Sequence, residues 1–145
     1  MAERIALHRA SRLQGWRTVE APLGIAQRIG AEPGDAATGL VEDLTLLLSN
    51  LMVEDERGAE ARAVAEVNAL LALAAHVVLV SNEVGMGIVP PYPLGRVFRD
   101  ALGRVNQAAA AACGEVYLLV AGLPFHVQSV GMKSNSSFVT SQERT

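Results

Sequence analysis

A run of apolar residues that ends abruptly in a polar, glycine-containing loop constrains the fold of this chain most. Residues 76–80 are rich in valine and show no polar alternation, which is typical of a strand buried on both faces of a parallel sheet. Residues 81–91 contain glycines that permit close backbone approach and end in two prolines, which cannot extend a sheet. Since ligands of open α/β sheets bind beyond the carboxyl ends of the strands, this loop predicts a site, and a tight turn without function is the alternative. The candidate residues of the loop are Asn82, Glu83, Gly85 and Gly87.

Basic residues surround a histidine near the amino end. Residues 1–14 have the composition of a helix, which Gly15 interrupts. Arg4, His8 and Arg12 recur at a spacing of four residues, so they lie along one helix face. Neighbouring guanidinium groups favour the neutral, nucleophilic imidazole and would hold a triphosphate beside it. The alternative is a solvated basic face of the helix.

Two adjacent acids separate a short strand from a helix. Residues 39–41 are predicted to form the strand, Glu42 and Asp43 follow, and residues 44–51 resume as an apolar helix. An acid at the carboxyl end of an apolar strand holds Mg²⁺ beside nucleotide phosphates in phosphate-loop enzymes. Acids are equally favoured at an ordinary helix N-terminus by the helix dipole. Both interpretations remain open from the sequence.

The remaining pattern alternates between strands and helices. The expected elements are a short strand at 16–20, helices at 23–29, 59–74 and 94–112, and a second buried strand at 115–120 that Gly122 and Pro124 end. This order predicts an α/β fold with a mainly parallel sheet and flanking helices. A single domain is expected over residues 1–127, followed by a polar, serine-rich tail at 128–145 that is predicted to be disordered.

The composition excludes several classes of protein. The chain has 145 residues, 50% of them hydrophobic, and a net charge of −3, so it lacks the basic excess that holds nucleic acid or an anionic membrane. The most apolar run, 70–80, is too short to span a bilayer, and the amino end lacks the apolar run of a signal peptide. Cys113 is the single cysteine, which suits a reducing compartment. These features predict a cytoplasmic protein.

Several motifs together resemble one enzyme family. The segment 81–90, followed by 98–100, 103–107 and 120–124, is similar to the bifunctional adenosylcobinamide kinase / adenosylcobinamide-phosphate guanylyltransferase family of cobalamin biosynthesis. The resemblance runs in the family's order from about residue 1 to about residue 124. It implies a kinase step on the aminopropanol hydroxyl of adenosylcobinamide. It also implies a guanylyltransferase step that moves GMP from GTP, through a histidine, to the resulting phosphate.

The resemblance also implies roles for individual residues. His8 matches the histidine that becomes guanylylated, and Glu42 matches the acid that binds Mg²⁺, with Asp43 standing where the family commonly has cysteine. The nucleotide-binding residues would be Arg9, Ala10, Ser11, Arg12, Glu20 and Glu42, and Arg99, Arg104 and Asn106 would help to wall the site. GTP, ATP and Mg²⁺ are the implied nucleotides and metal, adenosylcobinamide and its phosphate are the implied substrates, and a homo-oligomer is left open.

One part of the family's pattern precedes the matched region. In the family, a first strand, a Gly-x-x-x-x-Gly-Lys-Ser loop and a helix come before the residue that corresponds to Met1. The resemblance therefore implies a phosphate-loop nucleotidyl-type fold that lacks these parts, with an exposed strand edge and weak triphosphate binding. A misplaced start codon or a truncated product is the preferred account. The alternative is a non-catalytic remnant that acts as a weak nucleotide-binding or interaction module.

Overall fold

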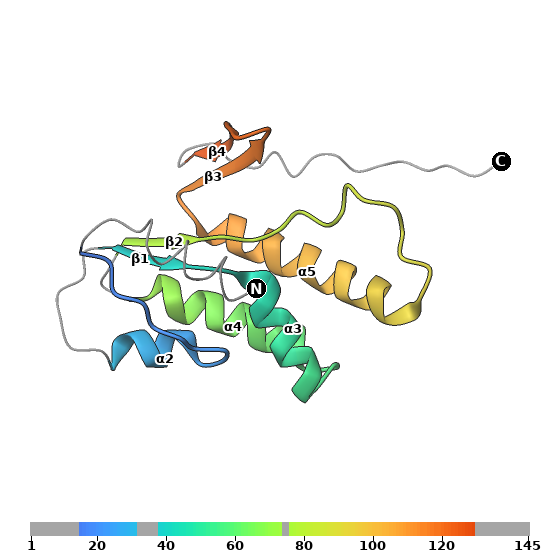
Figure 1. Ribbon diagram of the computed structural model, residues 1–145, viewed down its shortest axis with the longest axis horizontal. Coiled ribbons are helices and arrows are strands. Elements are labelled where there is room, and N and C mark those ends of the chain that lie inside the picture. Colours follow the sequence, from blue (N-terminus) through green and yellow to red (C-terminus); the bar gives the residue numbers. More distant parts are fainter. Residues whose placement is uncertain (1–14, 32–37, 74–75, 130–145) are drawn as a thin grey trace, which may run out of the picture.

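The computed structural model describes residues 15–31, 38–73 and 76–129 (Figure 1). The elements, in chain order, are α2 (Ile25–Gly30), β1 (Thr38–Val41), α3 (Leu44–Glu54), α4 (Ala59–Leu71), β2 (His76–Leu79), α5 (Pro93–Ala112), β3 (Glu115–Val120) and β4 (Leu123–Ser129). The helix predicted at 1–14 lies outside the described residues, as does the tail beyond residue 129. Residues 128 and 129 belong to β4.

The parallel pair β1 and β2 forms where the sequence predicts apolar strands. Thr38 pairs with His76, and the register continues to Val41 opposite Leu79. Beyond the ladder, the Val80 backbone N–H donates to the Val41 carbonyl at 3.0 Å. The two strands therefore end side by side, with their carboxyl ends at the same edge.

Only one face of this pair is buried. Val41 is 4% exposed and packs in a cluster with Ala26 of α2 and Leu70 of α4. Leu40 and Val78, which point to the opposite face, are each 44% exposed. The prediction that 76–80 is buried on both faces is therefore wrong. Side chains alternate between the faces of a strand, and within the described ranges the helices α2 and α4 cover one face.

The main core lies between the helices α3, α4 and α5. The buried side chains from these helices are Leu44, Leu47, Leu48 and Leu51 of α3, Ala59, Ala63 and Val67 of α4, and Ala101, Leu102, Val105 and Ala109 of α5. They recur at three- and four-residue intervals, the spacing of one helix face. The predicted helices at 44–51, 59–74 and 94–112 are thus confirmed, with α4 ending earlier, at Leu71.

The strand predicted at 115–120 is present, but its surroundings differ from the prediction. β3 and β4 form a two-stranded antiparallel sheet of their own, separate from β1 and β2 (Figure 1). Ala121 and Gly122, at φ angles of 51° and 79°, connect the strands, and positive φ at both central residues is the geometry that tight hairpins favour. Pro124 pairs with Leu119 inside the hairpin rather than ending it. Leu119 is 69% exposed, so burial of this strand was predicted wrongly.

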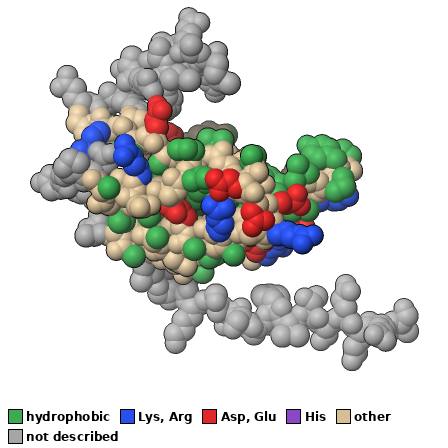
Figure 2. Space-filling model, turned by 90° about the horizontal axis from the view of Figure 1, so that it is seen from below, with side chains coloured by type: hydrophobic (Ala, Val, Ile, Leu, Met, Phe, Trp, Pro, Cys, Tyr) green, Lys and Arg blue, Asp and Glu red, His purple; other side chains and the backbone are tan. Residues whose placement is uncertain are grey.

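The described fold is mixed α/β, with one parallel and one antiparallel pair of strands. The short strand predicted at 16–20 does not form, because these residues join no ladder. The surface of the helices carries acidic and basic side chains close together (Figure 2). Across residues 15–129, apart from the gaps at 32–37 and 74–75, the structure contains no helix with the length and apolar character needed to cross a membrane.

Candidate functional site

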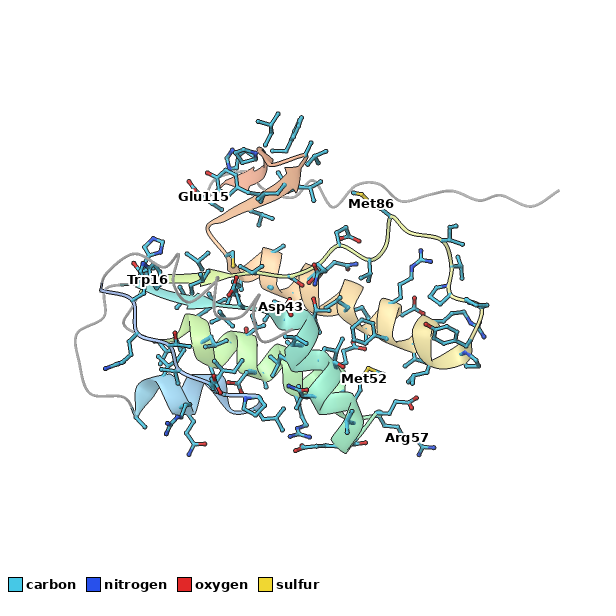
Figure 3. The ribbon with its side chains drawn as sticks, viewed as in Figure 1. Trp16, Asp43, Met52, Arg57, Met86 and Glu115 are labelled. Carbon is cyan, nitrogen blue, oxygen red and sulfur yellow. The ribbon has the colours of Figure 1, made fainter. Side chains whose placement is uncertain are left out.

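The carboxyl ends of β1 and β2 meet the first turn of α3 and the middle of α5. Asp43 stands at the junction of β1 and α3 (Figure 3) and caps the helix, since its Oδ1 accepts from the Leu46 N–H at 2.7 Å. A side-chain oxygen at this position satisfies one of the free N–H groups of the helix. Of the two interpretations of the adjacent acids, helix capping therefore holds for Asp43.

Asn82 connects the end of β2 to the start of α3. Its Nδ2 donates to the Thr45 Oγ1 at 2.8 Å and to the Asp43 Oδ2 at 3.4 Å. Its backbone N–H donates to the same Thr45 oxygen at 3.2 Å. The side chain and the backbone of one residue thus hold the two strand ends together.

Asn106 of α5 holds the same segment from the other side. Its Nδ2 donates to the Asn82 carbonyl at 3.1 Å, and its Oδ1 accepts from the Ser81 hydroxyl at 2.6 Å. We call the five residues Asp43, Thr45, Ser81, Asn82 and Asn106 the strand-end network. Together they fasten α3, the loop after β2 and α5 to one another.

Glu42 lies beside this network and has a different environment. Its side chain is exposed, and it makes no hydrogen bond or ion pair with another residue in the described part of the chain. Mg²⁺ in nucleotide sites binds one or two carboxylates together with phosphate oxygens and water. Glu42 fits that need, although the described ranges contain no cluster of three or more metal-binding side chains.

Glu83, Gly85 and Arg99 shape the first part of the loop. The Glu83 Oε1 accepts from the Gly85 N–H at 2.6 Å, and the Arg99 Nη2 donates to the Gly85 carbonyl at 3.1 Å. The Gly87 N–H donates to the Val84 carbonyl at 3.4 Å. Glu83 thus folds back on its own loop, and Arg99 ties that loop to α5.

The second part of the loop is fastened by residues that the sequence analysis did not select. The Arg96 Nη1 donates to the Pro90 and Pro91 carbonyls at 3.0 and 2.9 Å. At Gly95, a Cβ atom would lie 2.6 Å from the Tyr92 ring and 2.8 Å from Pro90. The close succession of prolines, glycine and arginine at the start of a helix is the sequence signal that indicates this packing.

Apolar side chains project from this fastened loop. Met86 and Ile88 are 78% and 97% exposed, and Figure 3 shows Met86 on the arch that runs from β2 toward the start of α5. Hydrophobic side chains also gather at that end of the molecule in Figure 2. Hydrogen bonds to backbone carbonyls therefore order the loop, while apolar groups face outward.

Arg104 lies away from the strand-end network. Its Nε donates to the Glu60 Oε1 at 2.8 Å, and its Nη2 lies 2.7 Å from the Glu60 Oε2. This two-point hydrogen bond lowers the pKa of Glu60 below its ordinary value. Residues 99 and 106 are seven positions apart on α5, about two helical turns, whereas 104 falls on another side of the helix. The structure therefore brings Arg99 and Asn106 to the loop and directs Arg104 to α4.

The remaining predicted site residues belong to the amino-terminal part of the chain. His8, Arg9, Ala10, Ser11 and Arg12 lie outside the described residues. Glu20 is exposed in the segment before α2 and belongs to no helix or strand. Thr45 and Ser81 are network residues that the sequence analysis missed, and their positions next to the predicted strand ends are the signal that indicates them.

Comparison with known proteins identifies the family. A family model described as cobinamide kinase / cobinamide phosphate guanyltransferase matches residues 1–127. The bifunctional adenosylcobalamin biosynthesis protein CobU of Escherichia coli (strain K12) is 42% identical over 137 aligned positions, with coverage of 85% of this chain and 76% of that protein. The bifunctional adenosylcobalamin biosynthesis protein CobP of Pseudomonas aeruginosa is 41% identical over 125 residues, which cover 86% of this chain and 72% of that protein.

A third relative agrees with these two. The CobU protein of Salmonella typhimurium is 42% identical over 139 aligned positions, with coverage of 85% of this chain and 76% of that protein. The resemblance drawn from the loop 81–90 and the segments after it is confirmed. The chain belongs to the cobinamide kinase / cobinamide phosphate guanyltransferase family.

Proposed function

We propose that this chain phosphorylates adenosylcobinamide and then transfers GMP from GTP to the resulting phosphate, through a covalent intermediate on His8. The observation that carries the proposal is the family match over residues 1–127, which includes His8 and the whole strand-end network. The position of that network at the carboxyl ends of parallel strands supports it further, since nucleotides bind at this edge of α/β sheets.

In the kinase step, the aminopropanol hydroxyl oxygen of adenosylcobinamide attacks the γ-phosphorus of ATP or GTP. The bond from that phosphorus to the bridging oxygen breaks, the nucleoside diphosphate leaves, and the hydroxyl proton is lost to solvent. Catalysis of such a step consists mainly of positioning and charge stabilisation. The strand-end network contributes the positioning at its edge of the sheet.

In the guanylyltransferase step, an imidazole nitrogen of His8 attacks the α-phosphorus of GTP and pyrophosphate leaves. A phosphate oxygen of adenosylcobinamide phosphate then attacks the same phosphorus, which breaks the P–N bond and regenerates His8. Arg9 and Arg12 stabilise charge on the α-phosphate, while Ala10, Ser11 and Glu20 contact the nucleotide. Glu42 would hold Mg²⁺, which neutralises charge on the phosphates when bound.

Labelling with GTP that is radioactive at the α-phosphate tests this proposal. The wild-type chain should acquire an acid-labile label, and addition of adenosylcobinamide phosphate should discharge it into product. His8→Ala should abolish the label because it removes the proposed nucleophile. The chain has three histidines, so His76→Ala, at the exposed start of β2, is the matched control and should label normally.

Two results would contradict the assignment. A label that persists in His8→Ala would assign the covalent step to another residue. A folded chain that binds GTP but never acquires label would favour the alternative function, a non-catalytic module that binds nucleotide or a partner weakly.

A further inference from the structure

The two acids at the end of β1 are adjacent in sequence but differ in what their carboxylates do. Both oxygens of Asp43 are engaged, Oδ1 with the Leu46 N–H at 2.7 Å and Oδ2 with the Asn82 Nδ2 at 3.4 Å. Glu42 is exposed, and none of the hydrogen bonds and ion pairs in the described part of the chain involves it. Asp43 is therefore an anchor, and Glu42 is the carboxylate free to meet a ligand.

The chemistry of the Asn82 amide fixes its orientation. An ionised carboxylate only accepts hydrogen bonds, so the NH₂ end of the amide must face Asp43. The same NH₂ group reaches the Thr45 hydroxyl oxygen at 2.8 Å. The Asn82 carbonyl is held separately by Asn106 at 3.1 Å, so both the side chain and the backbone of Asn82 are fixed.

The strand ladder alone gives little rigidity at this edge. β1 and β2 have four residues each, and an isolated pair of short strands is marginally stable in water. The network contacts join residues 24 to 39 positions apart in the chain. They add to the backbone hydrogen bonds of Val80, which donates to the Val41 carbonyl and accepts from the Leu44 N–H, in setting where β1 ends relative to β2.

We propose that Asn82 is a positioning residue for the nucleotide reaction: through Asp43 and Thr45 it fixes the backbone from which Glu42 projects, and so places the Glu42 carboxylate toward the Mg²⁺–nucleotide complex. The inference rests on the proposed function. It adds a role for the contact between Asn82 and Asp43.

An exchange of the two partners tests the contact directly. Asn82→Asp sets two carboxylates against each other, and this repulsion should displace the end of β1. Combined with Asp43→Asn, it restores an amide–carboxylate pair with the roles reversed. The new amide at position 43 can still cap α3 through its oxygen, since asparagine and aspartate cap equally well. The Thr45 hydroxyl can donate its proton to the new carboxylate at position 82.

The measurement is the binding of a fluorescent, non-hydrolysable GTP analogue at increasing Mg²⁺ concentrations, with thermal unfolding recorded for each variant. Asn82→Asp should raise the half-saturating Mg²⁺ concentration several-fold, toward the ~10-fold that loss of a direct outer-shell partner costs, because Asn82 acts on Glu42 only through the backbone. The double exchange should return it to within about threefold of wild type, since the pair is rebuilt. Asn68→Asp, which adds the same charge at an exposed position of α4, should leave it unchanged.

The outcomes separate this inference from the proposed function. If Asn82→Asp lowers Tm but leaves the Mg²⁺ dependence at the wild-type value, or if the exchange restores nothing, Asn82 has no positioning role. If the wild-type chain binds the analogue but forms no His8 adduct, the transfer reaction is rejected and the binding data still decide the role of Asn82. If the wild-type chain binds no Mg²⁺–nucleotide, both are rejected.

Discussion

Arg104 illustrates, at the scale of one residue, how a neighbouring helix can take a side chain away from the site. Its guanidinium forms a two-point contact with Glu60 of α4, at 2.8 and 2.7 Å. Planar, bidentate pairing of this kind is the arrangement that arginine favours with carboxylates. Its role here is therefore to connect α4 and α5.

This pair predicts a pH-dependent contribution to stability. The hydrogen bond from Arg104 lowers the pKa of Glu60 from its ordinary value of 4.5. A lowered folded-state pKa stabilises the protein above the unfolded value, and the stabilisation is lost as the pH falls through the folded value. Arg104→Gln should thus lower Tm slightly at pH 7, by the modest amount typical of exposed ion pairs. The difference from wild type should shrink as the pH falls below 4.5 and vanish once the pH lies below the lowered folded-state pKa of Glu60.

Thermal unfolding followed by circular dichroism between pH 3 and pH 7 measures this dependence. Arg57→Gln is the control, because Arg57 is exposed and its side chain makes no ion pair with any residue in the described ranges. A Tm difference for Arg104→Gln that stays constant across this pH range would contradict the assignment to Glu60.

At the scale of elements, the loop after β2 and the helix α5 form one unit. Arg96 and Arg99 of α5 both donate to loop carbonyls, and Gly95 lets Tyr92 and Pro90 close onto the first turn of the helix. Asn106 binds the beginning of the same loop two turns after Arg99. Side chains along α5 thus donate hydrogen bonds to the backbone of a loop that is not part of a strand.

Two glycines in α5 make a matched comparison of this packing. A Cβ at Gly103 would have no neighbour within 4 Å, whereas one at Gly95 would approach Pro90 at 2.8 Å. Gly103→Ala should raise the free energy of unfolding by about 0.5–1 kcal/mol through helix propensity. Gly95→Ala should lower it by about 1–3 kcal/mol because the loop must shift.

Urea unfolding measures both variants, and hydrogen exchange of the loop amides reports where the structure changes. Faster exchange in residues 83–92 of Gly95→Ala alone is the expected pattern. Equal stabilisation by both substitutions would mean that the loop is not packed on α5 as described.

The positions of the strands could be predicted from the sequence, whereas their burial could not. Apolar runs located β1, β2 and β3, since β-branched and other apolar side chains fit the pleated surface of a strand. Whether a strand is buried depends on what packs on it, and Val78 and Leu119 are exposed for that reason. The sequence predicts that Pro124 ends a strand, yet it pairs inside β4, because an outer strand can accommodate proline.

The candidate site could also be predicted only in part, because some of its residues depend on local helix geometry and others on distant contacts. The seven-residue spacing of Arg99 and Asn106 follows from helix geometry, and the structure places both at the loop. The direction of Arg104 depended on Glu60, which lies 44 residues away. No local pattern contains that information. The capping role of Asp43 was one of two open interpretations that only the hydrogen bond to Leu46 could separate.

At the scale of the whole molecule, the described chain has a densely packed helical part and a loosely attached hairpin. Val67 of α4 and Leu102 of α5 are fully buried, whereas Leu119 of β3 and Phe125 of β4 are 69% and 63% exposed. Local stability follows such differences in packing, because a segment with few buried contacts opens without unfolding the rest.

Native-state hydrogen exchange should therefore divide the molecule into two parts. Amides of α4 and α5 should exchange only through global unfolding, whereas those of β3 and β4 should exchange several-fold or more faster through local opening. The exchange rates are measured at two protein concentrations. Equal protection of hairpin and helices at both concentrations would contradict the division, and protection that grows with concentration would show that a second copy covers the hairpin.

The strand-end network also has a consequence for the order of folding. Its ties connect residues 37 and 39 positions apart between α3 and the loop, and 24 positions apart between the loop and α5. Contacts between distant parts of a chain form after the intervening segments have been ordered, because closing long loops opposes them entropically. We expect the helices α3, α4 and α5 to pack before Asn82 meets its partners, because burial of their apolar faces supplies stabilisation that the exposed network contacts lack. The edge assigned here to chemistry is thus expected to be among the last parts of the fold to form, so a chain that can orient Glu42 has already completed its core.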